Sequence, residues 1–231
     1  IEYFIGKLRR LKSKSVRFMI SVKFVIFVNT LYPLIDRGDF VEAQRIVDED
    51  KDGVVRHSEA LTLNERAELL LCTTLIRMCN GRLKEARHRL RTQMGIVQAI
   101  DNTMLANTLR IVNTMIYFEL GDSEFVASQC RSIMRDLNRR KGKEKHRVEI
   151  LLLKFMTNYS IPSTFREREM LWEKQKAVMR NLALDRSGSQ ILMYFDFTMW
   201  IKAKILARPI ADVIAEEARC REQREVMIPF R

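Results

Sequence analysis

The stretch LLLCTTLIRMCNGRLKEARHRL, residues 69–90, decides the fold of this chain. An apolar run with helical spacing stops at Asn80-Gly81, and an amphipathic run with Leu83 and Leu90 on one side begins at once. Glycine tolerates the left-handed backbone conformation that closes a helix, so Asn-Gly between two helical runs is typical of a tight helix-turn-helix. The stretch therefore predicts two α-helices joined at Gly81.

The same pattern recurs around Gly38 and Gly121, 43 residues before and 40 residues after Gly81. Apolar or small side chains occupy the same five positions in each copy: ten, six and three residues before the glycine, and five and nine after it. These residues are Val28, Tyr32, Ile35, Ala43 and Val47 in the first copy, Leu71, Leu75, Met78, Ala86 and Leu90 in the second, and Ile111, Met115, Phe118, Val126 and Cys130 in the third. A period of about 40 residues with two helices in each copy predicts an α-solenoid.

The run Val16 to Val28 is the most hydrophobic part of the chain near its start, and it follows a basic segment. This order invites comparison with a signal peptide, but Lys23 interrupts the run and no small-residue cleavage site follows. The run is also shorter than the roughly 20 apolar residues of a membrane span. We therefore expect a buried first helix and no membrane span.

Helix signals continue along the chain. Thr62-Leu-Asn-Glu65 has the form of a capping box, which predicts a helix beginning there. Further on, Pro162 predicts a break between two helices. The apolar segment Ile191 to Leu206 predicts one helix sandwiched between neighbours, and Pro209 suits the first turn of a last helix.

The composition agrees with a helical chain, because good helix formers dominate and there are only 8 Gly and 4 Pro among 231 residues. We expect an all-α fold, a right-handed α-solenoid of about five antiparallel helix pairs without a sheet. A single domain over residues 1–231 is expected, with the clearest repeats in 16–140 and degenerate pairs in 143–231. Because the first residue is Ile rather than Met, a piece of a longer protein is also consistent with the sequence.

The segments GDFVEAQRIV (38–47) and GRLKEARHRL (81–90) resemble the second helix of a tetratricopeptide repeat. The shared features are the glycine at the turn, an aromatic residue or Leu two positions later, and Ala five positions later. The chain departs from the family where a small residue is expected in the middle of the first helix, at Leu31, Thr74 and Thr114. Its units are also longer than the family's usual length of about 34 residues.

Two other segments, 117–141 and 194–209, are similar to the carboxy-terminal repeats of uncharacterised bacterial proteins. The resemblance to tetratricopeptide repeats implies a scaffold that binds a protein or peptide in the groove of the solenoid. Four cysteines without a CxxC pair favour a reduced, cytoplasmic protein.

No motif of a phosphate-binding loop, nucleophile elbow or zinc protease occurs, and His57, His88 and His146 lie far apart among charged residues. We therefore expect no catalytic activity, no cofactor and no metal site.

One alternative for a metal is calcium, because the acidic tract from Asp48 resembles an EF-hand loop. Asp48, Asp50 and Asp52 alternate, a glycine stands at the sixth position and Glu59 at the twelfth. Arg56 is a cation at the ninth position, which is a ligand position in such loops. A solvated acidic loop is the other interpretation.

The formal net charge of the chain is +12, although residues 32–60 carry more acidic than basic residues. Basic side chains concentrate in two places, the second helix of the middle copy and a linker about one and a half repeats later, and we expect them to form one binding ridge if the solenoid stacks their edges together. These candidate binding residues are Arg82, Lys84, Arg87, Arg91, Arg139, Arg140, Lys141, Lys143 and Lys145. An acidic protein or peptide is the expected partner. The alternatives are nucleic acid, bound through its phosphates, and a solvated face with no partner.

Overall fold

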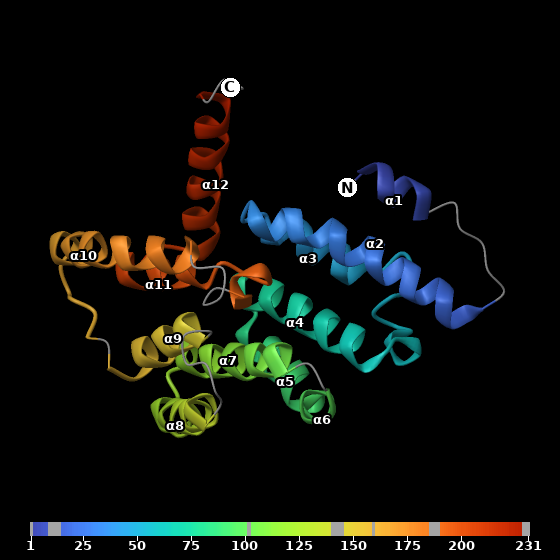
Figure 1. The fold of residues 1–231 in the computed structure, drawn as a ribbon, viewed down its shortest axis with the longest axis horizontal. Helices are drawn as coiled ribbons and strands as arrows, with labels where there is room; N and C mark the ends of the chain where they lie inside the picture. Colours follow the sequence, from blue (N-terminus) through green and yellow to red (C-terminus); the bar gives the residue numbers. More distant parts are fainter. Residues whose placement is uncertain are drawn as a thin grey trace. The chain divides into compact units, whose positions relative to one another are not determined.

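The computed structural model describes residues 2–8, 15–100, 103–139, 146–158, 160–184 and 190–227. These residues form helices and no strand, which confirms the all-α class (Figure 1). The α-helices are α1 (Glu2–Leu8), α2 (Val16–Asp36), α3 (Phe40–Glu49), α4 (Leu63–Cys79), α5 (Leu83–Thr92), α6 (Met94–Ala99), α7 (Thr103–Glu119), α8 (Ser123–Arg139), α9 (Arg147–Asn158), α10 (Phe165–Leu184), α11 (Phe197–Leu206) and α12 (Ile210–Met227). Short 3-10 helices are η1 (Ser58–Ala60) and η3 (Gln190–Met193).

The chain forms two compact units. The first comprises Ile1–Ile35 and Asp39–Ile116, and the second comprises Asp36–Gly38 and Tyr117–Arg231. The single domain and the stacking of helix pairs into a solenoid stay predictions.

The glycines of the three copies end their helices in the same way. The backbone φ angles of Gly38, Gly81 and Gly121 are 76°, 73° and 78°, all in the left-handed region. In each turn the amide of the residue after the glycine donates to the carbonyl five residues earlier, as in a Schellman motif. These bonds run from Asp39 to Leu34 (2.8 Å), from Arg82 to Arg77 (2.9 Å) and from Asp122 to Tyr117 (3.0 Å). The predicted helix turns are therefore confirmed.

The five apolar positions that recur in the three copies also predict the core. Of these fifteen side chains, thirteen are buried, and only Tyr32 and Phe118 are half-buried. The position seven residues before each glycine, where the tetratricopeptide family has a small residue, is occupied by Leu31, Thr74 and Thr114, each 0% exposed. Larger side chains thus fill a core position in all three copies.

Helix α4 is the centre of the first unit. It packs against α3, α5 and α6, so that almost every side of it is covered. The predicted capping box begins the helix: the Thr62 side chain accepts the Glu65 amide, and the Glu65 carboxylate accepts the Thr62 amide at 2.8 Å. Burial on nearly all sides explains why its sequence is apolar with little amphipathic contrast.

Helix α11 has the same central place in the second unit, where it packs against α9, α10 and α12. Its Trp200 ring meets Phe118 and Phe155 edge-on, with ring centroids 5.6 Å apart in both pairs. The Trp200 Nε1–H donates to Glu119 Oε1 at 2.8 Å, and Lys204 Nζ donates to Glu119 Oε2 at 2.6 Å. The expected burial of this helix between neighbours is confirmed.

The expected start of this helix at Ile191 was wrong. Residues Gln190–Met193 form the 3-10 helix η3 and α11 begins at Phe197. The reason is Asp196, whose carboxylate accepts the Thr198 amide at 3.2 Å and so caps the helix inside the apolar segment. Periodicity alone does not reveal such a break, because the residues on both sides of it are apolar and buried.

A fourth turn of the same kind joins α11 to α12. Ala207 has a φ angle of 52°, and the Arg208 amide donates to the Ala203 carbonyl at 3.0 Å. The closure matches the three glycine turns, but an alanine holds the left-handed position. For this reason the glycine pattern of the sequence does not predict this turn.

Helix α2 is longer than the apolar run that the sequence indicated. It has 21 residues and extends beyond Val28, so by length and composition alone it could cross a membrane, and the shortness of the run Val16 to Val28 does not exclude a span. The absence of a membrane span stays a prediction. Eight of its side chains are buried, among them Leu31 and Ile35. The Tyr32 hydroxyl donates to Glu68 Oε1 of α4 at 2.9 Å. Helices of this kind occur both in membranes and in the cores of soluble proteins.

Candidate functional site

Helix α5 presents a cationic face on one side. Lys84, His88 and Arg91 are exposed and Arg87 is half-buried. Their spacing of three, four and seven residues places them on one side of a helix. The side toward the core carries Ala86 and Leu90, each 0% exposed. We call Lys84, Arg87, His88 and Arg91 the α5 cationic face; sequence analysis selected its three Lys and Arg residues and left out His88.

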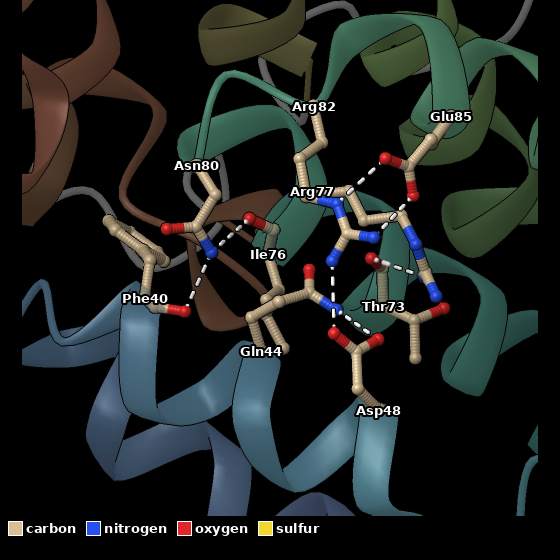
Figure 2. A network of polar contacts seen from close by, with 9 residues as sticks. All are labelled: Phe40, Gln44, Asp48, Thr73, Ile76, Arg77, Asn80, Arg82 and Glu85. Atoms are coloured by element: carbon tan, nitrogen blue, oxygen red, sulfur yellow. Dashed lines mark hydrogen bonds and ion pairs between the residues drawn. The ribbon is translucent and has the colours of Figure 1, made fainter.

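Arg82, which the sequence placed with these cations, does not share their face. Its guanidinium donates to both carboxylate oxygens of Glu85 and to Asp48 Oδ2 on α3, as Figure 2 shows. The distances are 2.8 and 2.7 Å to Glu85 and 3.0 Å to Asp48. These hydrogen bonds raise the pKa of Arg82. Arg82 thus connects two helices, and its donors are committed within the chain.

The contacts of Arg82 belong to a larger polar network across α3, α4 and α5 (Figure 2). The Gln44 amide donates to Asp48 Oδ1 at 2.8 Å. The Asn80 amide donates to the Phe40 carbonyl at 2.7 Å and to the Ile76 carbonyl at 3.1 Å. The asparagine before the turn glycine therefore joins the first and second copies of the repeat.

Two further arginines on the helices of this network, Arg77 on α4 and Arg89 on α5, are both half-buried. Arg77 Nη1 donates to the Thr73 carbonyl at 3.0 Å (Figure 2). Burial lowers the pKa of Arg77, and burial together with the nearby Arg77 charge lowers the pKa of Arg89. Arg89 Nε is buried without a hydrogen-bond partner in the described part of the chain. The sequence pattern did not indicate that Arg77 and Arg89 would influence each other, because they belong to different helices.

The residues of the calcium alternative have other roles in the structure. The Asp48 carboxylate accepts from Gln44 and Arg82, and the buried Asp50 carboxylate accepts the amides of Val55 (3.1 Å) and Arg56 (3.0 Å). Asp48 is exposed, as are Asp52, in a turn, and Glu59, in η1, but the Asp48 carboxylate is occupied by Gln44 and Arg82. Across the described ranges, no three His, Cys, Asp or Glu side chains form a group that could hold a metal ion. The geometry gives the calcium alternative no support.

The second basic cluster lies in the second unit. Arg139 is exposed at the end of α8, whereas Arg140, Lys141, Lys143 and Lys145 lie outside the described residues. Arg131 and Arg135 are also exposed and precede Arg139 at intervals of four, so the three share one face of α8. Arg131 and Arg135 were not among the predicted binding residues, although their spacing of four from Arg139 is visible in the sequence. The single ridge that would unite α5 with this cluster stays a prediction.

No family model matches the chain, and no match was found among curated proteins or solved structures. The resemblance to tetratricopeptide repeats therefore stays a prediction, and the proposals below rest on the geometry of the chain itself.

Proposed function

We propose that this chain is a non-catalytic scaffold module of tetratricopeptide-like helical repeats that binds an acidic protein or peptide. The observation that carries the proposal is the α5 cationic face on a helix whose opposite side is buried in the repeat core. In the proposed architecture the helix pairs stack as a right-handed solenoid in a single domain.

The α5 cationic face suits carboxylates on an extended or helical partner. Lys84 and Arg91 are seven residues apart, which corresponds to about 10 Å along a helix. Arginine binds a carboxylate through two parallel hydrogen bonds, while lysine acts as a point charge. A single exposed ion pair contributes only about 0–1 kcal/mol, so binding requires several of these cations together and weakens with salt.

The test is binding of a fluorescent Glu-rich peptide, measured by anisotropy at low and high NaCl concentration. We expect the double variant K84E/R91E to weaken binding at least tenfold at low salt, and wild-type binding to weaken as salt rises. The matched control is R166E/K174E, because Arg166 and Lys174 are exposed on α10 and the charge change is the same. Equal losses in both double variants would attribute binding to net charge and contradict the proposal.

The rival function is binding of nucleic acid. The row Arg131, Arg135 and Arg139 on α8 favours it, since regularly spaced cations neutralise phosphates. Stacking of bases has less support, because Phe118, Phe155 and Trp200 pack against one another. This function predicts a raised ratio of absorbance at 260 nm to 280 nm after purification and a gel shift at low salt. A clean ratio and no shift would exclude it.

A further inference from the structure

In the polar network of the first unit, Arg82 lies between the carboxylates of Asp48 and Glu85, whereas Arg77 and Arg89 form no such ion pair among the described residues. Asp48 and Glu85 supply its carboxylates, and each of their four oxygens already accepts a hydrogen bond or ion pair from Gln44 or Arg82. Arg77 donates to a backbone carbonyl, and Arg89 makes no side-chain hydrogen bond or ion pair to the described residues. Arg89 is therefore left without a carboxylate among the described residues, and Arg77 is within range of the Asp48 and Glu85 charges but makes no hydrogen bond to either carboxylate.

This end of the network is unfavourable in the free protein. Arg77 and Arg89 are both half-buried, and the charge of Arg77 helps to lower the pKa of Arg89. Arg89 Nε is shielded from water and has no acceptor among the residues that the structure describes. Buried donors in native proteins are nearly always paired, and an unpaired one invites an explanation by a missing ion or ligand. The feature that would satisfy both arginines is an anion.

We propose that Arg77 and Arg89 form an oxyanion site that receives a side-chain carboxylate of the acidic partner. This rests on the proposed function, and it assigns the anchoring contact to a different side of α5 from the cationic face. Planar guanidinium groups match the two oxygens of a carboxylate, and a half-buried pair is less screened by salt than exposed lysines.

The two groups of cations then have separate kinetic roles. Exposed charges such as Lys84 and Arg91 steer the encounter, so their loss lowers the association rate. Arg89 holds the bound carboxylate in a shielded position, so its loss raises the dissociation rate. The difference separates anchoring from general attraction.

The principal variant is Arg89→Met, which keeps much of the aliphatic length and removes the charge and the unpaired donor. The control is Arg91→Met on the exposed face of the same helix. With the Glu-rich peptide we expect Arg89→Met to weaken binding at least tenfold, mainly through faster dissociation, and Arg91→Met to weaken it less than threefold. We expect the urea midpoint of the free Arg89→Met protein to equal or exceed that of wild type, because a like-charge contact is removed.

The opposite pattern would overturn the proposal: a lower urea midpoint for Arg89→Met with unchanged peptide binding indicates a structural arginine. If Arg89→Met does not fold, Arg89→Lys keeps the charge but loses the planar fork. Faster peptide dissociation from Arg89→Lys supports the site, and a rate equal to wild type counts against it.

A second arm uses inorganic phosphate and no peptide. Melting temperatures are compared in sodium phosphate and in sodium chloride of equal ionic strength at pH 7, and we expect phosphate to stabilise wild type more than Arg89→Met. General salt effects on burial act on both proteins alike.

The two arms distinguish the two proposals. A phosphate difference without peptide binding keeps the oxyanion site and refutes the acidic-peptide function. Peptide binding that Arg89→Met leaves intact, with no phosphate difference, refutes the site and keeps the function. Failure of both arms refutes both.

Discussion

Alanine substitution of the turn glycines separates backbone strain from steric contact. An L-residue in the left-handed region costs roughly 1–2 kcal/mol, and the smaller freedom of alanine in the unfolded chain returns about 0.4–1 kcal/mol. At Gly81 and Gly121 an added Cβ atom meets nothing within 4 Å, so strain is the only cost. We expect Gly81→Ala and Gly121→Ala each to lower the free energy of unfolding by about 1 kcal/mol.

Gly38 differs because its turn is covered. An added Cβ atom would lie 2.6 Å from the Ala211 carbonyl oxygen and 3.1 Å from the Ala215 amide nitrogen, both backbone atoms of α12 in the same compact unit. Backbone cannot turn aside as a flexible side chain can, so the helix or the turn has to shift. Overpacking of this kind typically costs about 1–3 kcal/mol more. We expect a total loss of about 2–4 kcal/mol for Gly38→Ala.

Urea unfolding tests this order, with circular dichroism at 222 nm reporting the whole chain. Both tryptophans, Trp172 and Trp200, lie in the second unit, so fluorescence follows that unit separately. We expect Gly38→Ala to lower the fluorescence midpoint most. If Gly38→Ala were no more destabilising than Gly81→Ala, the close approach of α12 to the turn would be refuted. A loss of 3 kcal/mol or more at Gly81 would refute the open turn there.

Three other predictions concern the cap of α4, the half-buried Glu119 carboxylate of the second unit and the buried thiols. Thr62→Ala removes the capping box and should cost about 1 kcal/mol in urea unfolding, whereas Thr62→Ser should cost much less; equal losses would contradict the cap. Glu119→Ala leaves the Trp200 N–H without its acceptor and should cost about 1–3 kcal/mol, while Glu119→Gln keeps an acceptor and should cost less; fluorescence-monitored unfolding that ranks them the other way would refute the bond. Burial raises the pKa of Cys130 to about 11 and that of Cys72 further, so the folded chain binds more protons than the unfolded one. Stability should therefore fall as pH rises from about 8.5, the usual thiol pKa, toward 11. In a variant with Cys79 and Cys220 replaced by Ser, a thiol reagent at pH 8 should react only on unfolding, and rapid reaction of the native protein would contradict the burial.

Much of the fold was predictable because its signals are local. A left-handed glycine, a Ser/Thr-x-x-Glu box and a helical period each depend on residues within one or two turns of one another. For this reason Gly81 and its two counterparts predicted both the turns and the core positions, down to the small buried Ala43 and Ala86. The same reasoning failed at Ala207, where the conformation is present without the usual residue.

The candidate site was only half predictable. The period of a helix places Lys84, Arg87 and Arg91 on one side of α5, and the structure exposes two of them and half-buries the third. Their sequence neighbour Arg82 looks equivalent in composition, yet it is bound by Asp48, which lies 34 residues earlier in the chain. No local rule predicts that pairing, because it requires α3 and α5 to pack against the same helix, α4.

The sequence by itself determined that the chain is helical, that helices turn at Gly38, Gly81 and Gly121, and which side chains around these turns enter the core, because helix formation and burial follow from spacing along one segment. The tertiary structure decided which charges are neutralised and which are left over. Asp48 and Glu85 satisfy Arg82, while Arg77 donates to a backbone carbonyl and Arg89 Nε has no hydrogen-bond partner among the described residues. The physical reason is that the electrostatic state of a side chain depends on neighbours from other helices, and packing alone brings those neighbours within reach.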